Sequence, residues 1–268
     1  MVSPVLARAG PSAASNGRRE RMVVHVSRGV VVYEGPSLID GAPIVALASW
    51  RSANRKTGDV PQVWILRRDL PPLAATRAGA DRSICGDCPL RGRVLGGRNV
   101  GRSCYVVVAH APTSVWLAYR RGAYRRVGRA RLGRLFAGAF VRLGAYGDPA
   151  AVPLAVWRSM LARARGWTAY THQWREGFAL QDLAMASCET DADARDAAAM
   201  GYRVFRVTPP DGRRLPGYGS CPASAEQGRR STCLECGACN GGDPATRPHV
   251  QIQIHGQGAR YALPLLAS

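Results

Sequence analysis

Hydrophobic and polar positions follow two different patterns along the chain. Short runs rich in valine and isoleucine predict strands at residues 22–33, 44–50 and 63–66, the first followed by a turn at Gly35 and Pro36. After residue 140, strand-like runs alternate with helix-like spacing. The expected order is strand, helix, strand, strand, helix, strand, over residues 141–146, 153–164, 167–171, 183–187, 191–200 and 202–207. This alternation is typical of parallel βαβ units, so we expect an α/β fold with a partial (β/α) barrel or a short doubly wound sheet.

Composition divides the chain into three expected parts. Residues 1–21, rich in Ser, Ala, Gly, Arg and Pro, predict a disordered basic tail. Residues 22–215 are expected to form the partial barrel with its N-terminal strands, and residues 216–268 a cysteine-rich metal-binding extension packed on the barrel. No apolar run approaches the roughly 20 residues that cross a bilayer, and the first residues do not resemble a signal peptide. We therefore expect a cytoplasmic protein without membrane contact.

Basic residues outnumber acidic ones, giving a formal net charge of +19. More than half of this excess lies in residues 81–145, and the densest part, residues 116–134, contains no acid. Such a segment favours polyanions through phosphate contacts and is a candidate surface for DNA or RNA. The alternative is a solvated helix face in an arginine-rich proteome. The candidate nucleic-acid contacts are Arg120, Arg121, Arg125, Arg126 and Arg129.

The first set of cysteines comprises Cys85, Cys88 and Cys104. A four-thiolate zinc ribbon would place a fourth cysteine at position 107, where the chain has a valine. A fourth ligand would therefore come from His110, from Cys188 or from outside the protein. An iron–sulfur cluster held by three thiolates leaves one iron without a protein ligand, so that this iron can bind a substrate or another small molecule. Catalytic zinc sites likewise keep an open coordination position, whereas structural zinc sites do not. Together with the β/α repeat, this arrangement suggests cofactor-based radical chemistry.

The second set is a stronger metal-binding signal. Two successive C-x2-C spacings and a remote fourth cysteine resemble the ligation of a [4Fe–4S] cluster in ferredoxins. Zinc is the alternative, although three cysteines within seven residues suit tetrahedral zinc less well than two separated pairs do. We expect one or two [4Fe–4S] clusters in the protein. The second set comprises Cys221, Cys233, Cys236 and Cys239.

Several short motifs carry a resemblance to a known family. In order they are NRKTG (54–58), CGDCP (85–89), CY (104–105), VRLGAYGDP (141–149), AYTHQWR (169–175), MAS (185–187), TCLECGAC (232–239) and HGQGAR (255–260). In these motifs the chain resembles uncharacterised bacteriophage and prophage proteins of the mycobacteriophage gene-product-88 type, over roughly residues 45–262. The resemblance implies a radical-SAM-like partial barrel, iron–sulfur ligands at the first cysteine set, and a phage origin with residence in the host cytoplasm. The usual C-x3-C-x2-C loop of radical-SAM enzymes is absent, which puts S-adenosylmethionine binding in doubt but not cluster binding.

Other residues are candidates by their position. Asp148 and His172 follow expected strands, where β/α barrels place catalytic groups. The alternatives are a capping aspartate in a turn and an ordinary histidine with a neighbouring partner. Arg142 and Arg206 lie on expected strands, and a buried arginine needs an anionic partner. Lys56, the only lysine, lies in a loop that could contact phosphate.

Three hypotheses of function follow. The first is a phage-type iron–sulfur protein with a potentially reactive cluster at the first set and a structural or electron-relaying cluster at the second, acting on nucleic acid or a nucleotide. The second is a zinc-stabilised nucleic-acid-binding protein without enzymatic activity. The third is a phage protein that binds and disables a host protein through its basic charge.

Overall fold

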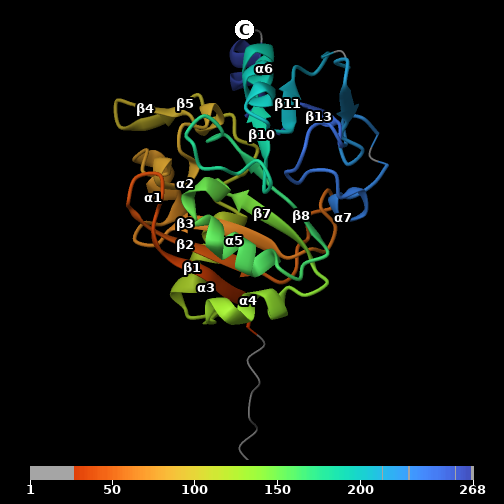
Figure 1. Cartoon of the computed structure of the whole chain (residues 1–268). Coiled ribbons are helices and arrows are strands. Elements are labelled where there is room, and N and C mark those ends of the chain that lie inside the picture. The colour runs from red at the N-terminus through yellow and green to blue at the C-terminus, as the bar shows by residue number, and fades with distance from the viewer. Residues whose placement is uncertain (1–26, 213, 229, 257, 267–268) are drawn as a thin grey trace, which may run out of the picture.

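A computed structural model describes residues 27–212, 214–228, 230–256 and 258–266, and its fold is mixed α/β, as expected (Figure 1). The predicted tail at residues 1–21 and the start of the strand expected from Met22 lie outside the described residues. Within the described ranges, every helix is too short or too polar to cross a bilayer.

The first sheet has the strand order β6-β1-β2-β3-β7-β8. The strands β1, β2 and β3 form an antiparallel meander, and β7 runs parallel to both β3 and β8. The turn expected at Gly35 and Pro36 is wrong, because both residues belong to β1 and the chain turns only after them. A proline is tolerated there because it lies at the end of the strand. The bounds are β1 (Gly29–Pro36), β2 (Pro43–Ser49), β3 (Gln62–Arg67), β6 (Tyr124–Arg126), β7 (Phe140–Tyr146) and β8 (Gly166–Thr168).

The second sheet has the order β12-β13-β11-β10-β9, and each neighbouring pair in it is parallel. Its strands are β9 (Tyr170–Thr171), β10 (Met185–Cys188), β11 (Val204–Thr208), β12 (Tyr218–Ser220) and β13 (His249–Gln253). The last two strands come from the region expected to form the C-terminal extension. A separate hairpin joins β4 (Arg93–Leu95) to β5 (Arg98–Val100).

The two sheets meet at Ala169, which alone separates β8 from β9. Its N–H donates to the carbonyl of Cys239 at 2.9 Å, and its carbonyl accepts from Met185 at 3.0 Å. The strand expected over residues 167–171 is therefore divided between two sheets. In the part of the chain that is described, the sheets do not close into a barrel.

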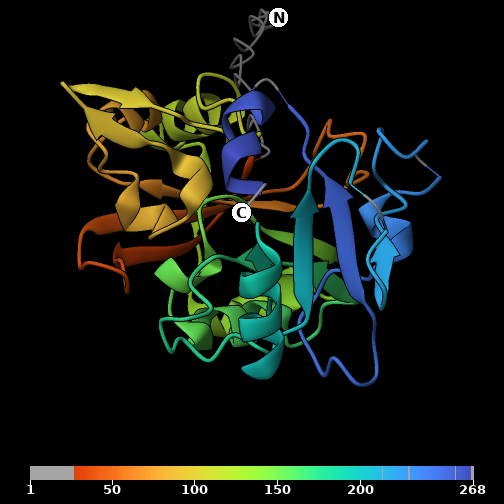
Figure 2. The same ribbon diagram turned by 90° about the horizontal axis from the view of Figure 1, so that it is seen from above.

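Two helices confirm the expected periodicity. α5 (Leu154–Leu161) lies within the predicted range 153–164, and α6 (Asp191–Ala199) begins after Thr190, whose side chain accepts a hydrogen bond from Asp193 N–H. Figure 2 shows α6 lying beside β10 and β11. The other helices are α1 (Pro72–Arg77), α2 (Arg82–Cys85), α3 (Ala111–Arg120), α4 (Arg129–Leu135), α7 (Cys233–Cys236) and α8 (Leu263–Leu266), with 3₁₀ turns η1 (Pro89–Arg91), η2 (Pro149–Ala151) and η3 (Ala259–Tyr261).

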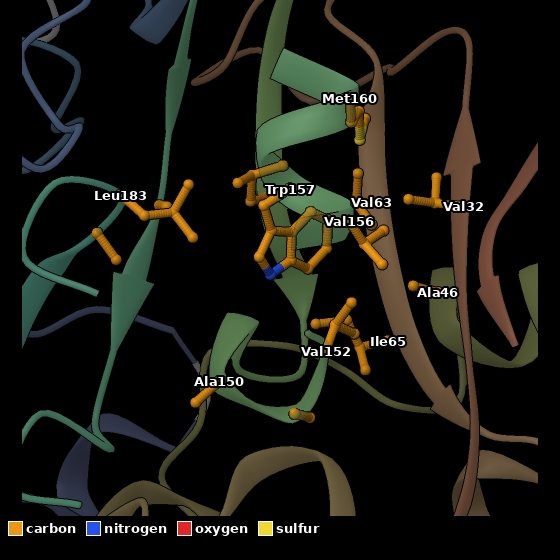
Figure 3. Close-up of a cluster of buried hydrophobic side chains, with 14 of the residues drawn as sticks. Val32, Ala46, Val63, Ile65, Ala150, Val152, Val156, Trp157, Met160 and Leu183 are labelled. Carbon is orange, nitrogen blue, oxygen red and sulfur yellow. The ribbon is translucent and has the colours of Figure 1, made fainter. Parts of the chain in front are cut away.

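The apolar side of α5 forms the centre of the core. Trp157 is fully buried and lies among side chains of α5, η2 and the first sheet, as Figure 3 shows. Its indole N–H donates to the carbonyl of Pro149 at 3.0 Å. This bond fixes η2, and with it the chain that leaves β7, relative to the core.

Candidate functional site

One cavity of about 390 Å³ lies between the two sheets and is lined by most of the predicted catalytic and metal-ligand residues. It is lined by residues of strands β7, β9, β10, β11 and β13, by the segments that contain the first cysteine set, and by residues of the NRKTG loop and of the chain from β12 to α7. Parallel sheets commonly bind ligands beside the carboxyl ends of their strands. The predicted site residues that line the cavity are Cys85, Cys88, Cys104, Asp148, His172 and Cys233.

The first cysteine set faces this cavity from a short, tightly folded segment. Cys85 ends α2, and the N–H of Cys88 donates to the carbonyl of Cys85 at 3.2 Å. Cys104 is held against the same segment because its N–H donates to the carbonyl of Leu90 at 2.9 Å. Burial and the neighbouring Cys88 raise the pKa of Cys85 well above its usual value. Burial also raises the pKa of Cys104, and Arg102 opposes this shift.

A buried carboxylate organises the chain around these thiols. Asp81, with no exposed surface, accepts from Arg91 at 3.0 Å and from Arg102 at 3.3 Å. Arg91 and Arg102 flank the hairpin β4–β5, so one aspartate holds both ends of the loop that separates Cys88 from Cys104. Burial raises the pKa of Asp81, and the two arginines act against that shift.

His172 lies beside a thiol and a buried carboxylate. Its Nε2 is 2.9 Å from Glu189 Oε1 and 3.8 Å from Cys88 Sγ. Burial alone would lower the pKa of His172, but Cys88 and Glu189 outweigh it and raise that pKa well above its usual value. Glu189 directly follows β10 and is 2 % exposed. His172 therefore lies between the Cys88 thiol and the Glu189 carboxylate, and His172 and Cys88 line the cavity.

Asp148 acts as a cap rather than as a free acid. Its Oδ1 accepts from Ala150 N–H at 2.9 Å and from the Thr171 hydroxyl at 2.8 Å, and its Oδ2 accepts from His172 N–H at 2.8 Å. Burial raises the pKa of the carboxyl, and these hydrogen bonds oppose the shift. Asp148 therefore joins η2 to β9 and positions His172, which matches the capping alternative for this residue.

Three cysteines of the second set, Cys221, Cys233 and Cys239, lie in a smaller apolar cluster with strand β13. Cys221, Cys233 and Cys239 are buried, and Cys236 is half-buried. Burial and the nearby thiols of the set raise the pKa of Cys239 to about 12, although the Tyr170 hydroxyl opposes this. Thr232 and Glu235 form a reciprocal capping box at the start of α7.

The NRKTG loop holds α7 in place and brings Lys56 to the cavity. The N–H groups of Cys233 and Leu234 donate to the carbonyls of Lys56 and Thr57, at 2.9 and 3.1 Å. The Asn54 side chain accepts from Lys56 N–H at 2.9 Å, which fixes the loop. Burial lowers the pKa of Lys56. The motif thus connects the second cysteine set to the cavity that contains the first.

The thiols do not form a preassembled metal site. Among the described residues, which include all eight cysteines, no three or more His, Cys, Asp and Glu side chains form a group that could hold a metal ion. The two fourth ligands considered for the first set are also elsewhere. His110 is exposed before α3, and Cys188 is buried in the main core with its thiol 3.7 Å from the carbonyl of Ala186.

The basic segment at residues 116–134 lies away from the cavity. It is not one helix but the end of α3, the strand β6 and the helix α4. The helices α3 and α4 lie at the end of the molecule opposite α6, and α4 precedes the start of β7 (Figure 1). The candidate nucleic-acid contacts are all exposed: Arg120, Arg121, Arg125, Arg126 and Arg129.

Three residues of the site were not predicted from the sequence. Asp81 and Glu189 are single acids in unremarkable contexts, and Tyr105 appeared only as part of the CY motif. Their partners are distant in sequence: Glu189 meets His172, and Tyr105 accepts a hydrogen bond from the guanidinium of Arg142. One usable signal was that Glu189 lies two residues beyond an expected strand, as Asp148 does.

No protein-family model, curated protein or solved structure matches this chain. The resemblance to the phage protein family therefore stays a prediction from the motifs.

Proposed function

We propose that this protein binds an iron–sulfur cluster at its first cysteine set and presents it to a small-molecule ligand. The observation that carries the proposal is the lining of one cavity by Cys85, Cys88 and Cys104. Thiolate is the ligand that iron–sulfur clusters prefer. When bound, the cluster would supply redox or radical chemistry, and this chain would supply the ligands and the surrounding cavity.

The chemistry of the donors suits such a group, although the thiols are not arranged as a preassembled metal site in the described structure. Burial and neighbouring thiols raise the pKa of Cys85 and of Cys239, which favours the protonated thiol at these two residues when no metal is bound. A metal ion replaces those protons and removes the repulsion between thiolates. In the first set the protein contributes three thiols, and His172 beside Cys88 is the neighbouring nitrogen donor.

The second set is proposed to hold a second cluster with a structural or electron-relaying role. Three of its four cysteines lie in one apolar cluster, Cys236 ends α7, and Cys233 also lines the cavity. Zinc at this set is the alternative. The parallel strands around the cavity are proposed to be a partial β/α barrel, and residues 216–268 its metal-binding extension.

Cysteine variants test the proposal. Cys85→Ala and Cys104→Ala should lower the iron content of anaerobically purified protein and its absorbance near about 400 nm. Cys188→Ala is the matched control because that thiol is buried outside the cavity, and it should keep its iron. Equal iron content in all three variants and the wild type, or stoichiometric zinc without iron, would contradict the proposal.

A second proposed activity is nucleic-acid binding by the basic segment. It is supported by the exposure of its arginines, of which Arg126 pairs with Glu34 at 3.0 Å. Its location away from the cavity makes this binding a separate activity of the same chain. An acidic host protein is the competing partner for this surface.

A further inference from the structure

Arg142 is a buried cation in an unusual situation. It lies within β7, is 6 % exposed and lines the cavity. Its Nη2 donates to the hydroxyl of Tyr105, and its buried Nε has no hydrogen-bond partner in the described structure. A buried guanidinium is costly unless an anion and hydrogen bonds compensate for the lost water. The described protein atoms therefore do not fully compensate the Arg142 guanidinium for its lost water.

The two other buried arginines of the described chain, Arg203 and Arg206, differ in their partners. Arg203 donates to the carbonyls of Asn240 and Pro248, both at 2.8 Å, although its Nε has no partner among the described residues. Arg206 pairs with Asp191 at 3.0 Å, and Arg102 pairs with Asp81 at 3.3 Å. In the described ranges, Arg142 forms no ion pair with a carboxylate. Arg203 is thus held by backbone carbonyls and Arg206 by a carboxylate, whereas the guanidinium of Arg142 has the Tyr105 hydroxyl as its one hydrogen-bond partner among the described residues.

Lys56 adds a second positive charge to the same cavity. It also forms no ion pair among the described residues, and its loop is fixed by Asn54 and α7. Two carboxylates line the cavity, and both are engaged by other groups. Asp148 caps η2, and Glu226 accepts from the Ser224 hydroxyl at 2.6 Å.

We infer that Arg142 and Lys56 form a binding site for the oxyanion group of a small organic ligand, a carboxylate or a phosphate. Guanidinium binds both groups through directed, charge-assisted hydrogen bonds. A cavity of about 390 Å³ is within the range that small molecules occupy. The rings of Tyr105 and His255 stack at 5.7 Å beside Arg142 and provide a planar surface for the rest of the ligand. The inference rests on the proposed function, because it places the ligand of that function in the thiol-lined cavity.

Binding measurements on anaerobically purified full-length protein test this site. The probes are two matched pairs that differ in the oxyanion: adenosine 5′-monophosphate with adenosine, and 3-phenylpropionate with 3-phenylpropanol. The variants are Arg142→Gln and Lys56→Gln, with Lys56→Arg as a charge-preserving variant. Arg195→Gln, on the exposed side of α6, is the control for the loss of one positive charge. The iron content of every variant is measured alongside.

We expect one charged probe to bind and its uncharged counterpart to bind at least ten-fold more weakly. The pair that responds distinguishes a phosphate from a carboxylate ligand. Arg142→Gln and Lys56→Gln should each weaken the charged probe at least ten-fold, since charge-assisted hydrogen bonds are among the stronger ones. Lys56→Arg should restore most of the affinity, and Arg195→Gln should leave it unchanged. If Arg142→Gln fails to fold, Lys56→Gln still tests the site, because the half-buried Lys56 can be replaced with less disturbance of the fold.

Two results would overturn the inference. One is the absence of binding by either charged probe, or binding that neither variant weakens. The other is a loss of iron in both Arg142→Gln and Lys56→Gln while the affinity for the charged probe falls no more than that for its uncharged counterpart. That result would mean that the two cations offset the negative charge of the thiolates instead of binding a ligand. A colourless, iron-free wild type that still binds a charged probe through both cations would defeat the proposed cluster and leave the oxyanion site standing.

Discussion

Arginine side chains occupy two different environments in two regions of this molecule. Around the cavity, Arg91, Arg102 and Arg142 are largely removed from water and lie close to thiols, buried acids or the cavity itself. On the basic segment at residues 116–134 the arginines are exposed, and a partner such as Glu34 is itself partly exposed. Charge in a buried environment must be compensated, whereas charge at the surface interacts weakly through water. The net charge of +19 therefore combines arginines in two different environments.

The first prediction compares a buried acid with an exposed one. Asp81→Ala leaves two arginines without their buried partner and should lower the free energy of unfolding by about 3–5 kcal/mol. Glu34→Ala removes the partner of Arg68 and Arg126 at the surface and should cost about 1 kcal/mol or less. Chemical denaturation monitored by circular dichroism measures both values. Similar losses in the two variants would show that the regions do not differ in this way.

The second prediction compares two glycines with positive φ. Gly86 has φ of 54°, and a Cβ there would lie 2.1 Å from the Gln173 side chain, between the first two cysteines. Gly122, within the basic segment, has φ of 75° and open space around it. Gly86→Ala should therefore lower the free energy of unfolding by about 2–4 kcal/mol, from strain and crowding together. Gly122→Ala should cost about 1 kcal/mol from backbone strain alone.

The iron content of the same two variants sharpens this comparison. Gly86→Ala moves the segment that carries Cys85 and Cys88, so it should also lower the iron bound by the purified protein. Gly122→Ala should bind as much iron as the wild type. A Gly86→Ala variant as stable and as iron-rich as Gly122→Ala would contradict the position given to this segment.

The third prediction concerns the exposed arginines and has the smallest effect on stability. Replacing Arg120, Arg121, Arg125 and Arg126 by serine should change the free energy of unfolding by about 1 kcal/mol or less, because the side chains are exposed. It should weaken binding to duplex DNA or to RNA and lower the slope of log affinity against log salt by about 4. Fluorescence anisotropy across a salt series measures both. Unchanged affinity and slope would remove nucleic acid as the partner of this surface.

Local patterns predicted the elements of the fold better than their pairing. The helices α5 and α6 follow directly from helical spacing and the capping residue Thr190. The end of β1 was missed because Gly35 and Pro36 usually mark a turn, although here they finish a strand. The division of the strand at Ala169 was also missed, since it depends on hydrogen bonds to Met185 and Cys239 from other segments.

The candidate site was predicted in part for the same reason. Cysteine spacing identified both thiol sets, and the position after a strand identified Asp148 and His172. The acids Asp81 and Glu189 could not be found this way because their partners are distant in sequence. Sequence also predicted that a buried Arg142 needs an anion, but only the folded chain shows that no carboxylate of the described residues pairs with it.

The iron and acid-labile sulfide content of the anaerobically purified protein tests the central claim most directly. The proposed function predicts a brown protein that absorbs near about 400 nm, with iron and sulfide in equal amounts. Cys85→Ala and Cys104→Ala should lose iron, and Cys188→Ala should retain it. A colourless protein that holds stoichiometric zinc when it is isolated from iron-replete cells would contradict the account.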